Sequence, residues 1–211
     1  MVEFGTGGWR AVIGDGFTRE NIRRIAAALA RRMVREGVAE KGICAGYDRR
    51  FLSREALVWF CEVMTGEGVL VRFVNISCPT PQVMFTVKRL ELPYGAMVTA
   101  SHNPAIWNGI KLFTSGGRDA SAEITAEIQK EANAIDPESI RTLSFDQARE
   151  QGRLILTDPR DDYLDSILAQ VDTEAIRKRR LRIVLDPMFG VSLTGLLTIL
   201  YTARCDVDVI N

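Results

Sequence analysis

Apolar side chains in the first part of the chain recur first at helical spacing and then as a strand-like run. Between residues 22 and 33 they recur at every third or fourth position, which predicts a helix capped by Thr18 and ended by Gly37. The short apolar run at residues 43–47 instead predicts a strand.

The same two patterns repeat after residue 50. Ser53 is expected to cap a second helix, which Gly66 closes, and residues 69–74 predict another strand. Strands that alternate with helices in this order predict a partly parallel sheet. Further along, the pattern predicts a helix at residues 82–90, strands at 95–100 and 110–114, and a helix at 121–134.

The pattern starts again after residue 157, where we place a domain boundary. The expected elements are a helix that starts near Asp158, a strand at 181–185, a buried helix at 193–201 and a strand at 207–210. Such a βαβ unit is begun but not completed, so we expect a C-terminal portion to be missing. The predicted fold is α/β: a three-layer α/β/α sandwich with a mixed, partly parallel sheet over residues 1–157, and an incomplete second α/β domain over residues 158–211.

Charge and composition exclude several kinds of partner. Basic and acidic side chains both number 27, so the net charge is zero and neither nucleic acid nor a membrane is an expected partner. The N-terminus lacks the regions of a signal peptide, and the longest uncharged run, residues 187–203, is shorter than the ~20 apolar residues that span a bilayer. The four cysteines form no C-x-x-C pair and are expected to be buried thiols of a cytoplasmic protein.

The densest group of reactive side chains follows the strand predicted at residues 95–100. It contains T-A-S-H-N-P at residues 99–104 and N-G-I-K at residues 108–111. A serine hydroxyl can carry a phosphoryl group, an imidazole can move a proton, and a lysine can offset phosphate charge. Because Ser101 lies just past the carboxyl end of a strand, where α/β proteins bind ligands, these residues favour phosphoryl transfer.

Two other interpretations fit the same residues. S-H-N-P is also typical of a plain polar turn. A serine beside the chain's only histidine could instead belong to a hydrolase, but no G-x-S-x-G elbow surrounds Ser101 and adjacent side chains generally point apart. His102 is therefore expected to serve a substrate hydroxyl rather than to activate Ser101.

Two further clusters carry weaker signals. Residues 4–10, F-G-T-G-G-W-R, combine glycines that let an anion approach the backbone with an arginine that can bind phosphate, but a flexible loop with a chance arginine has the same composition. They are not a P-loop, because no G-K-[ST] follows. Residues 46–50, G-Y-D-R-R, follow a strand and open a helix, so Asp48 and Arg50 could equally form a capping ion pair.

In this order and spacing, the three clusters resemble domain 1 of the α-D-phosphohexomutases, the phosphoglucomutase/phosphomannomutase family. The hallmarks of that family are F-G-T-x-G-x-R, G-x-D-x-R, and T-A-S-H-N-P followed by N-G-x-K. Residues 186–190, D-P-M-F-G, resemble the start of the family's second domain. The resemblance implies an isomerase-class phosphotransferase that interconverts hexose 1-phosphate and hexose 6-phosphate through a hexose 1,6-bisphosphate, which also serves as activator.

The resemblance also implies roles for individual residues. Ser101 carries the phosphoryl group, and His102 and Lys111 assist proton transfer and charge stabilisation. Arg10 contacts the phosphoserine or the transferring group. The phosphate on Ser101 would be one ligand of a Mg²⁺ ion. The residues expected to bind substrate or phosphate are Thr6, Gly7, Arg50, Asn103 and Asn108.

Three parts of the family's active site are absent from the sequence: the D-G-D-x-D-R metal loop, the G-E-x-S-G sugar-contacting loop and the C-terminal phosphate-binding domain. The remaining Mg²⁺ ligands are expected in that metal loop. Because transfer needs positioning and charge neutralisation together, the chain alone is expected to be nearly inactive, and nothing in it selects among glucose, mannose and glucosamine phosphates. The alternative is a stand-alone sugar-phosphate-binding or regulatory module without turnover.

Overall fold

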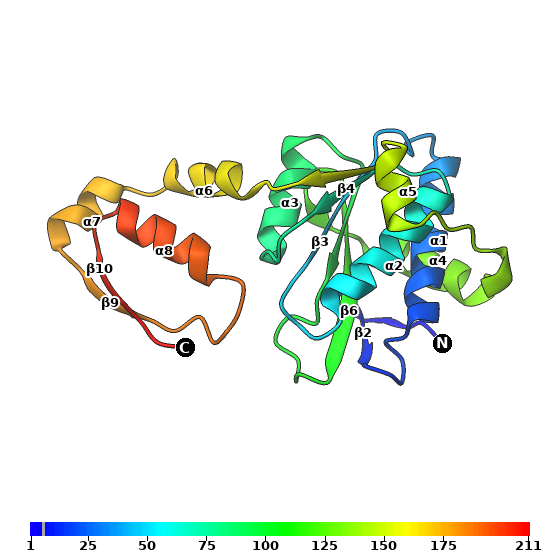
Figure 1. The fold of residues 1–211 in the computed structure, drawn as a ribbon, viewed down its shortest axis with the longest axis horizontal. Coiled ribbons are helices and arrows are strands. Elements are labelled where there is room, and N and C mark those ends of the chain that lie inside the picture. The colour runs from blue at the N-terminus through cyan, green and yellow to red at the C-terminus, as the bar shows by residue number, and fades with distance from the viewer. Residues whose placement is uncertain (6) are drawn as a thin grey trace. The chain divides into compact units, whose positions relative to one another are not determined.

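The computed structural model describes residues 1–5 and 7–211. These residues form two compact units, Met1–Thr157 and Asp158–Asn211, each with its own sheet (Figure 1). The larger unit contains all of the sequence motifs that suggest phosphate chemistry, so its sheet positions the candidate site.

An eight-stranded sheet forms the centre of the larger unit. Its strands are β1 (Phe4–Gly5), β2 (Gly8–Val12), β3 (Ile43–Tyr47), β4 (Val71–Val74), β5 (Tyr94–Val98), β6 (Trp107–Thr114), β7 (Arg118–Asp119) and β8 (Leu154–Thr157). The order is β1-β2-β6-β5-β3-β4-β8, and β7 pairs with β6. Strands β5, β3, β4 and β8 pair in parallel, whereas β6 is antiparallel to both β2 and β5. The sheet is therefore mixed and partly parallel, as predicted.

Helices cover both faces of this sheet. They are α1 (Arg19–Arg35), α2 (Ser53–Gly66), α3 (Thr80–Arg89), α4 (Ala122–Ala134) and α5 (Phe145–Glu150), with a 3₁₀ turn at Pro137–Ser139. Apolar side chains of α1, α2, α4 and α5 share one core with the sheet. On the opposite face, Val83 and Val87 of α3 pack with Met97 and Phe113 of the sheet. The predicted three-layer α/β/α arrangement is confirmed (Figure 1).

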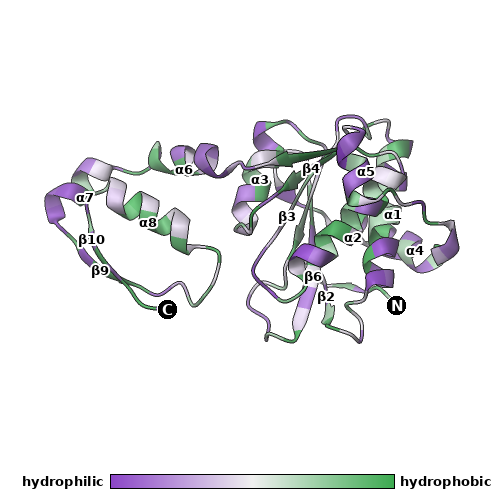
Figure 2. Cartoon of the chain, in the orientation of Figure 1, coloured by the Kyte–Doolittle hydropathy of each residue, from purple (hydrophilic) through white to green (hydrophobic). Residues whose placement is uncertain are grey.

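The central strands are apolar along their length because helices cover both of their faces. Every residue of β3 and β5 is buried, and the strand labelled β3 is drawn mostly in green in Figure 2. At the sheet edge, β8 leaves Ile155 and Leu156 exposed. In β6 the side chains alternate, so that Ile110 joins the α1–α2 core while Phe113 joins the α3 side.

The glycine-rich N-terminus is a pair of strands rather than a flexible loop. β2 pairs antiparallel with β6, and β1 folds back on β2. A Cβ atom on Gly109 would lie 2.1 Å from the carbonyl oxygen of Trp9, so glycine is what permits this close pairing. The apolar pattern does not predict these strands, because glycines interrupt it.

The start of α2 also differs from the prediction. Ser53 is the first helical residue, and the capping position belongs to Leu52, which has a left-handed backbone with φ of 61° and makes no side-chain capping bond. The Ser53 hydroxyl instead donates to Asp48 Oδ1 at 2.9 Å and accepts from the Asn108 amide at 2.9 Å. The predicted Ser53 cap is therefore wrong, because long-range partners engage its hydroxyl, whereas Thr18 caps α1 as predicted.

The smaller unit contains the elements expected after residue 157 and, in addition, the helix α7 (Thr173–Arg179), which was not predicted. The expected elements are α6 (Arg160–Leu168), β9 (Arg182–Leu185), α8 (Leu193–Thr202) and β10 (Asp206–Val209), and the two strands pair in parallel. The prediction that α8 is buried is wrong: it has no buried residue, and Tyr201 is 57% exposed. A two-stranded sheet offers too little surface to cover this helix. In the described part of the chain, no helix is long and apolar enough to cross a membrane.

All four cysteines are free and buried, as predicted. Burial raises the pKa of Cys44 to about 12 and raises the pKa of Cys61 well above its ordinary value. Thiols held in this protonated form are poor nucleophiles. Cys44 and Cys61 are therefore not expected to be reactive groups of this chain.

Candidate active site

Ser101 lies on an exposed loop that follows β5. This loop, residues 99–107, is called the Ser101 loop below; it turns back where the Asn103 N–H donates to the Ala100 carbonyl oxygen at 3.1 Å. Both Ser101 and its neighbour His102 are exposed. The loop leaves the carboxyl end of a parallel strand, which is the edge at which α/β sheets bind ligands.

The backbone of Ser101 is left-handed, with φ of 56°. This conformation is uncommon for a residue with a side chain and concentrates at functional sites. With this backbone, Ser101 Oγ lies 3.4 Å from His102 Nδ1. The expectation that the two adjacent side chains point apart is therefore wrong, because it assumed an ordinary backbone at Ser101.

Arg10 and Lys111 lie on the same face of the sheet. Arg10 pairs with Gly109 across β2 and β6, and Gly109 and Lys111 face the same side because positions along a strand alternate. The Arg10 Nη2 and Lys111 Nζ atoms each lie 4.0 Å from the point that a Cβ on Gly7 would occupy. Two cationic groups thus converge on a glycine, where no side chain keeps an anion away.

The same strand pairing links these cations to the Ser101 loop. The Thr99 N–H donates to the carbonyl oxygen of Gly109 at 3.0 Å, and Gly109 is the register partner of Arg10. Within the described residues, the buried Arg10 Nε has no hydrogen-bond partner. A bound anion would satisfy this donor, which is otherwise costly to bury. Thr6, which is also predicted to bind phosphate, lies outside the described residues.

Asp48 joins the end of β3 to the end of β5. Its Oδ2 accepts from the Thr99 hydroxyl at 2.6 Å, and its Oδ1 accepts from the Ser53 hydroxyl at 2.9 Å and from the Arg50 N–H at 3.0 Å. Thr99 Oγ1 in turn accepts the Ser101 N–H at 2.9 Å. Neither Asp48 nor Thr99 is among the predicted site residues. The signal that could have found them is a carboxylate and a hydroxyl at the ends of two neighbouring strands.

The Arg50 guanidinium lies against the Ser101 loop. It donates to the carbonyl oxygens of four loop residues at 2.6 to 3.0 Å. Its Nε also lies 3.8 Å from Asp48 Oδ2, which is the ion pair considered as the alternative reading of the sequence. The role of Arg50 in phosphate binding stays a prediction, and this geometry does not favour it, because the protein itself engages the guanidinium.

The two predicted asparagines lie in different surroundings. Asn108 is fully buried: its amide donates to the Phe51 carbonyl and to Ser53 Oγ, and its Oδ1 accepts the Gly109 N–H. These bonds argue against a ligand-binding role for Asn108 and give it a structural one. Asn103 Oδ1 has no hydrogen-bond partner in the part of the chain that the structure describes, so Asn103 stays a candidate for accepting a bond from a ligand hydroxyl.

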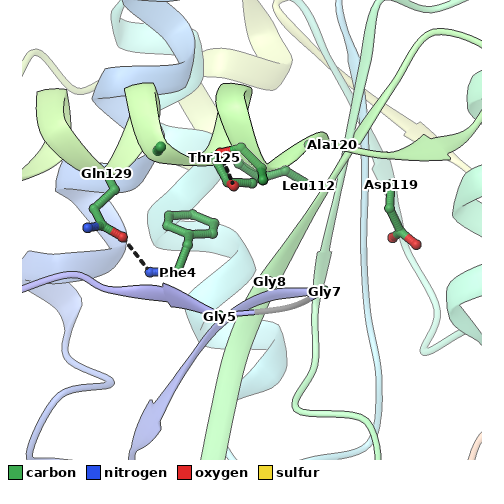
Figure 3. Close-up of a pocket in the computed structure, with 11 residues that line it drawn as sticks. Phe4, Gly5, Gly7, Gly8, Leu112, Asp119, Ala120, Thr125 and Gln129 are labelled. Atoms are coloured by element: carbon green, nitrogen blue, oxygen red, sulfur yellow. Dashed lines mark hydrogen bonds between the residues drawn. The ribbon is translucent and has the colours of Figure 1, made fainter.

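A hollow lies between β1 and α4, and Gly7 and Gly8 also line it (Figure 3). Its lining includes Phe4, Asp119 and Gln129, and Gln129 Oε1 accepts the Phe4 N–H at 2.7 Å. Among the described residues that line it there is a carboxylate but no lysine or arginine. The hollow therefore suits a phosphate less well than the space between Arg10 and Lys111.

The side chains present do not make a magnesium site. In residues 1–5 and 7–211, no group of three or more His, Cys, Asp or Glu side chains is placed to hold a metal ion. Both oxygens of Asp48, beside the Ser101 loop, already accept hydrogen bonds. A phosphate on Ser101 would supply one oxygen ligand, but the described side chains do not supply the rest of a magnesium shell.

Comparison with known proteins gives a consistent result. Residues 1–139 match the α/β/α domain I of the phosphoglucomutase/phosphomannomutase family. The chain is 32% identical over 216 residues to a phosphoglucomutase/phosphomannomutase of Thermococcus kodakarensis, covering 99% of this chain and 44% of that protein. It is 27% identical over 202 residues to a phosphoglucomutase of Staphylococcus saprophyticus, covering 92% of this chain and 36% of that protein. The chain thus spans less than half the length of these curated relatives.

Solved structures resemble the chain over nearly its whole length. A crystal structure from Thermus thermophilus, of a protein assigned as a phosphomannomutase, has a TM-score of 0.84 at 29% identity and covers 99% of this chain and 45% of that chain. The open form of Paramecium parafusin, a phosphoglucomutase, has a TM-score of 0.81 at 16% identity, covers 98% and 44%, and supports the fold alone. With the three motifs assembled around one sheet edge, the chain belongs to the phosphoglucomutase/phosphomannomutase family.

Proposed function

We propose that this chain supplies the phosphoserine part of a phosphohexomutase, with Ser101 as the phosphoryl carrier. The observation that supports it best is the placement of the Ser101 hydroxyl, which is exposed at the ligand-binding edge of the sheet and lies 3.4 Å from His102 Nδ1. Arg10 and Lys111 converge beside Gly7 on the same sheet. The names of the relatives favour hexose phosphates as the substrate class.

In the proposed transfer, the phosphoryl group passes from Ser101 to a hexose monophosphate. The P–O bond to Ser101 Oγ breaks while a P–O bond to a sugar hydroxyl forms. That hydroxyl loses its proton to His102, and the departing Ser101 Oγ takes up a proton from the imidazole, whose Nδ1 lies 3.4 Å away. Lys111 and Arg10 offset charge on the phosphoryl oxygens during the transfer. The resulting hexose 1,6-bisphosphate turns over and returns its other phosphoryl group to Ser101.

The proposal assigns the remaining parts of the active site to residues that this chain does not contain. The chain spans 44% of its Thermococcus relative, and its described side chains do not form a magnesium site. We assign residues 1–157 to domain 1 and residues 158–211 to the start of domain 2. Alone, the chain is proposed to be nearly inactive, and the complete enzyme is proposed to work in the cytoplasm.

The test is intact-mass spectrometry of the polypeptide encoded by the complete reading frame, incubated with glucose 1,6-bisphosphate and Mg²⁺. We expect an added phosphoryl group that maps to Ser101 and is missing from the Ser101→Ala variant. Ser115→Ala, which removes an exposed hydroxyl from the turn after β6, is the matched control and should be phosphorylated normally. An unmodified wild type whose mutase activity survives Ser101→Ala would contradict the proposal and favour a binding module.

A further inference from the structure

The segment that follows β3 holds the Ser101 carbonyl directly and holds the Ser101 N–H through the Thr99 hydroxyl. The Ser101 carbonyl oxygen accepts from Arg50 Nη2 at 2.8 Å. The Ser101 N–H donates to Thr99 Oγ1 at 2.9 Å, and the Thr99 hydroxyl donates to Asp48 Oδ2 at 2.6 Å. Asp48 and Arg50, which follow β3, therefore fix the position of Ser101, which follows the neighbouring strand β5.

Arg50 holds the rest of the loop as well. Its Nη2 donates to the Asn103 carbonyl at 2.6 Å, and its Nη1 donates to the carbonyls of Pro104 and Trp107 at 3.0 Å each. The remaining Nε lies 3.8 Å from Asp48 Oδ2, an ion-pair contact that is too long for a hydrogen bond. Four of the five guanidinium N–H donors are therefore used by the loop, and at most one is left for a substrate phosphate.

The conformation of Ser101 explains why such support is needed. Its φ of 56° lies in the left-handed region, which a residue with a Cβ atom occupies only when its surroundings fix it there. The side chains of Arg50 and Asp48 are only 15% and 16% exposed, although the Ser101 and Pro104 carbonyl groups that Arg50 contacts lie at the surface. Several bonds from two largely buried side chains are thus suited to hold the serine against its preferred backbone conformation.

We propose that Asp48 and Arg50 are positioning residues that hold the phosphoryl-carrying serine in its left-handed conformation, and that Arg50 is not a phosphate ligand. This inference rests on the proposed function, because it concerns the same serine. Misplacing a reacting group by about 1 Å can slow a reaction by about 100-fold. Lysine at position 50 would keep the positive charge but lose the planar guanidinium that contacts four carbonyls. The Arg50→Lys variant therefore separates a role in holding the loop from a role in attracting a phosphate.

The first experiment measures the order of the Ser101 loop in the 211-residue chain without substrate. Amide hydrogen exchange of residues 99–107 is compared by mass spectrometry in the wild type, in Arg50→Lys and in Arg153→Ala, a control that removes an exposed ion pair with Glu40. We expect exchange in this loop to rise about 10-fold in Arg50→Lys and to stay unchanged in the control. Unchanged exchange in Arg50→Lys overturns the proposal. If that variant unfolds, Thr99→Val, which removes the other anchor of Ser101, is measured instead and judged in the same way.

The second experiment follows phosphorylation of Ser101 by glucose 1,6-bisphosphate in the polypeptide encoded by the complete reading frame. Arg50→Lys is expected to lower the maximal rate about 100-fold and to leave the half-saturating concentration of the donor within about 3-fold. Arg50→Ala is expected to regain rate with added guanidinium ion and not with ammonium ion. A raised half-saturating concentration at an unchanged maximal rate would assign Arg50 to phosphate binding and overturn the inference.

The two experiments separate failure of the inference from failure of the proposed function. A wild type that is never phosphorylated refutes the proposed function, and the exchange measurement then decides by itself whether Arg50 orders the loop. A wild type that is phosphorylated, with an Arg50→Lys variant that exchanges and reacts like it, refutes the inference alone.

Discussion

Two groups of cationic side chains lie near the Ser101 loop, and the protein treats them in opposite ways. Arg50 donates to four backbone carbonyl groups and faces Asp48. Arg10 and Lys111 instead converge on Gly7, and the buried Arg10 Nε has no hydrogen-bond partner among the residues described. The protein therefore uses the four Nη N–H donors of Arg50 and leaves Arg10 and Lys111 available to a ligand.

The difference teaches how to tell a positioning cation from a ligand-binding one. Arg10, Arg50 and Lys111 all belong to motifs that suit phosphate, so charge alone does not separate them. Hydrogen bonding within the protein separates them, because a buried donor without a partner is costly and a bound anion can complete it. Replacing Arg10 and Lys111 should therefore change function and not stability. Replacing a charged side chain that is hydrogen-bonded within the protein should instead change the order of a loop or the free energy of unfolding.

The largest effect is expected when Arg10→Ala and Lys111→Ala are combined. Each hydrogen bond to a charged phosphate contributes about 1.5–3 kcal/mol, so losing both should slow phosphorylation of Ser101 by roughly 100- to 10,000-fold. The free energy of unfolding should stay within about 0.5 kcal/mol of the wild-type value. Mass spectrometry measures the first quantity and urea denaturation the second.

A matched control removes the same charge elsewhere. Arg35 and Lys130 are exposed cations on α1 and α4, and replacing both by alanine should leave the phosphorylation rate unchanged. An equal loss in this control would mean that general charge attraction explains the effect. Unfolding of the Arg10/Lys111 double variant would contradict the prediction that these two cations serve a ligand and do not stabilise the fold.

The second largest effect is expected at Glu67, a carboxylate that is paired with arginines within the protein and is far from Ser101 in sequence. Its side chain is 2% exposed and lies 3.0 Å from Arg31 and 2.9 Å from Arg141. Glu67→Gln should lower the free energy of unfolding by about 2 kcal/mol, because it leaves two guanidinium groups without their counter-charge, and it should not slow phosphorylation. In urea denaturation, Glu131→Gln, whose carboxylate is 37% exposed, is the control and should cost less than about 0.5 kcal/mol.

The contribution of Glu67 also has a defined pH dependence. Burial raises the pKa of Glu67, but hydrogen bonds from Arg31 and Arg141 outweigh it and leave the pKa below its ordinary value of 4.5. The ionised carboxylate therefore stabilises the fold above pH 4.5, and this contribution is lost as the pH falls through the folded-state pKa. The difference in unfolding free energy between wild type and Glu67→Gln should shrink from about pH 6 to about pH 3. A difference that stays constant over that range would contradict the ion-pair account.

The smallest effect is a gain in stability from Ser101→Gly. The left-handed backbone at Ser101 costs a residue with a Cβ atom about 1 kcal/mol, and glycine avoids this cost while making the unfolded chain more flexible. We expect a net gain of about 0.5 kcal/mol in urea denaturation, together with complete loss of phosphorylation. Ser115→Gly, without a left-handed backbone in the wild type, should show no gain. A Ser101→Gly variant less stable than wild type would show that the serine is not strained.

Features that depend on short local patterns could be predicted from the sequence. The apolar spacing of α1 and the apolar run of β3 each identify one element, and their alternation with later elements gives the layered sheet. Ser101, His102 and Lys111 stand in a motif that directly follows or forms a strand, so their placement at one sheet edge needs only local structure.

Features that depend on contacts between distant segments could not be predicted in the same way. Ser53 loses its capping role because Asp48 and Asn108 engage its hydroxyl, and Asn108 is buried by the same contact. Strand β2 is recognisable only from its pairing with β6, since glycines break its apolar pattern. The role of Arg50 depends on carbonyl groups more than 50 residues away, which no spacing rule connects to it.

The central claim, that Arg10 and Lys111 bind the phosphoryl group while Arg50 holds the loop, is tested most directly by a crystal structure of this chain with phosphoserine at position 101. The account predicts a phosphate bound by Arg10 and Lys111 beside Gly7, with Arg50 still bonded to its four loop carbonyls. A phosphate bound by Arg50, with those carbonyl bonds broken, would contradict it.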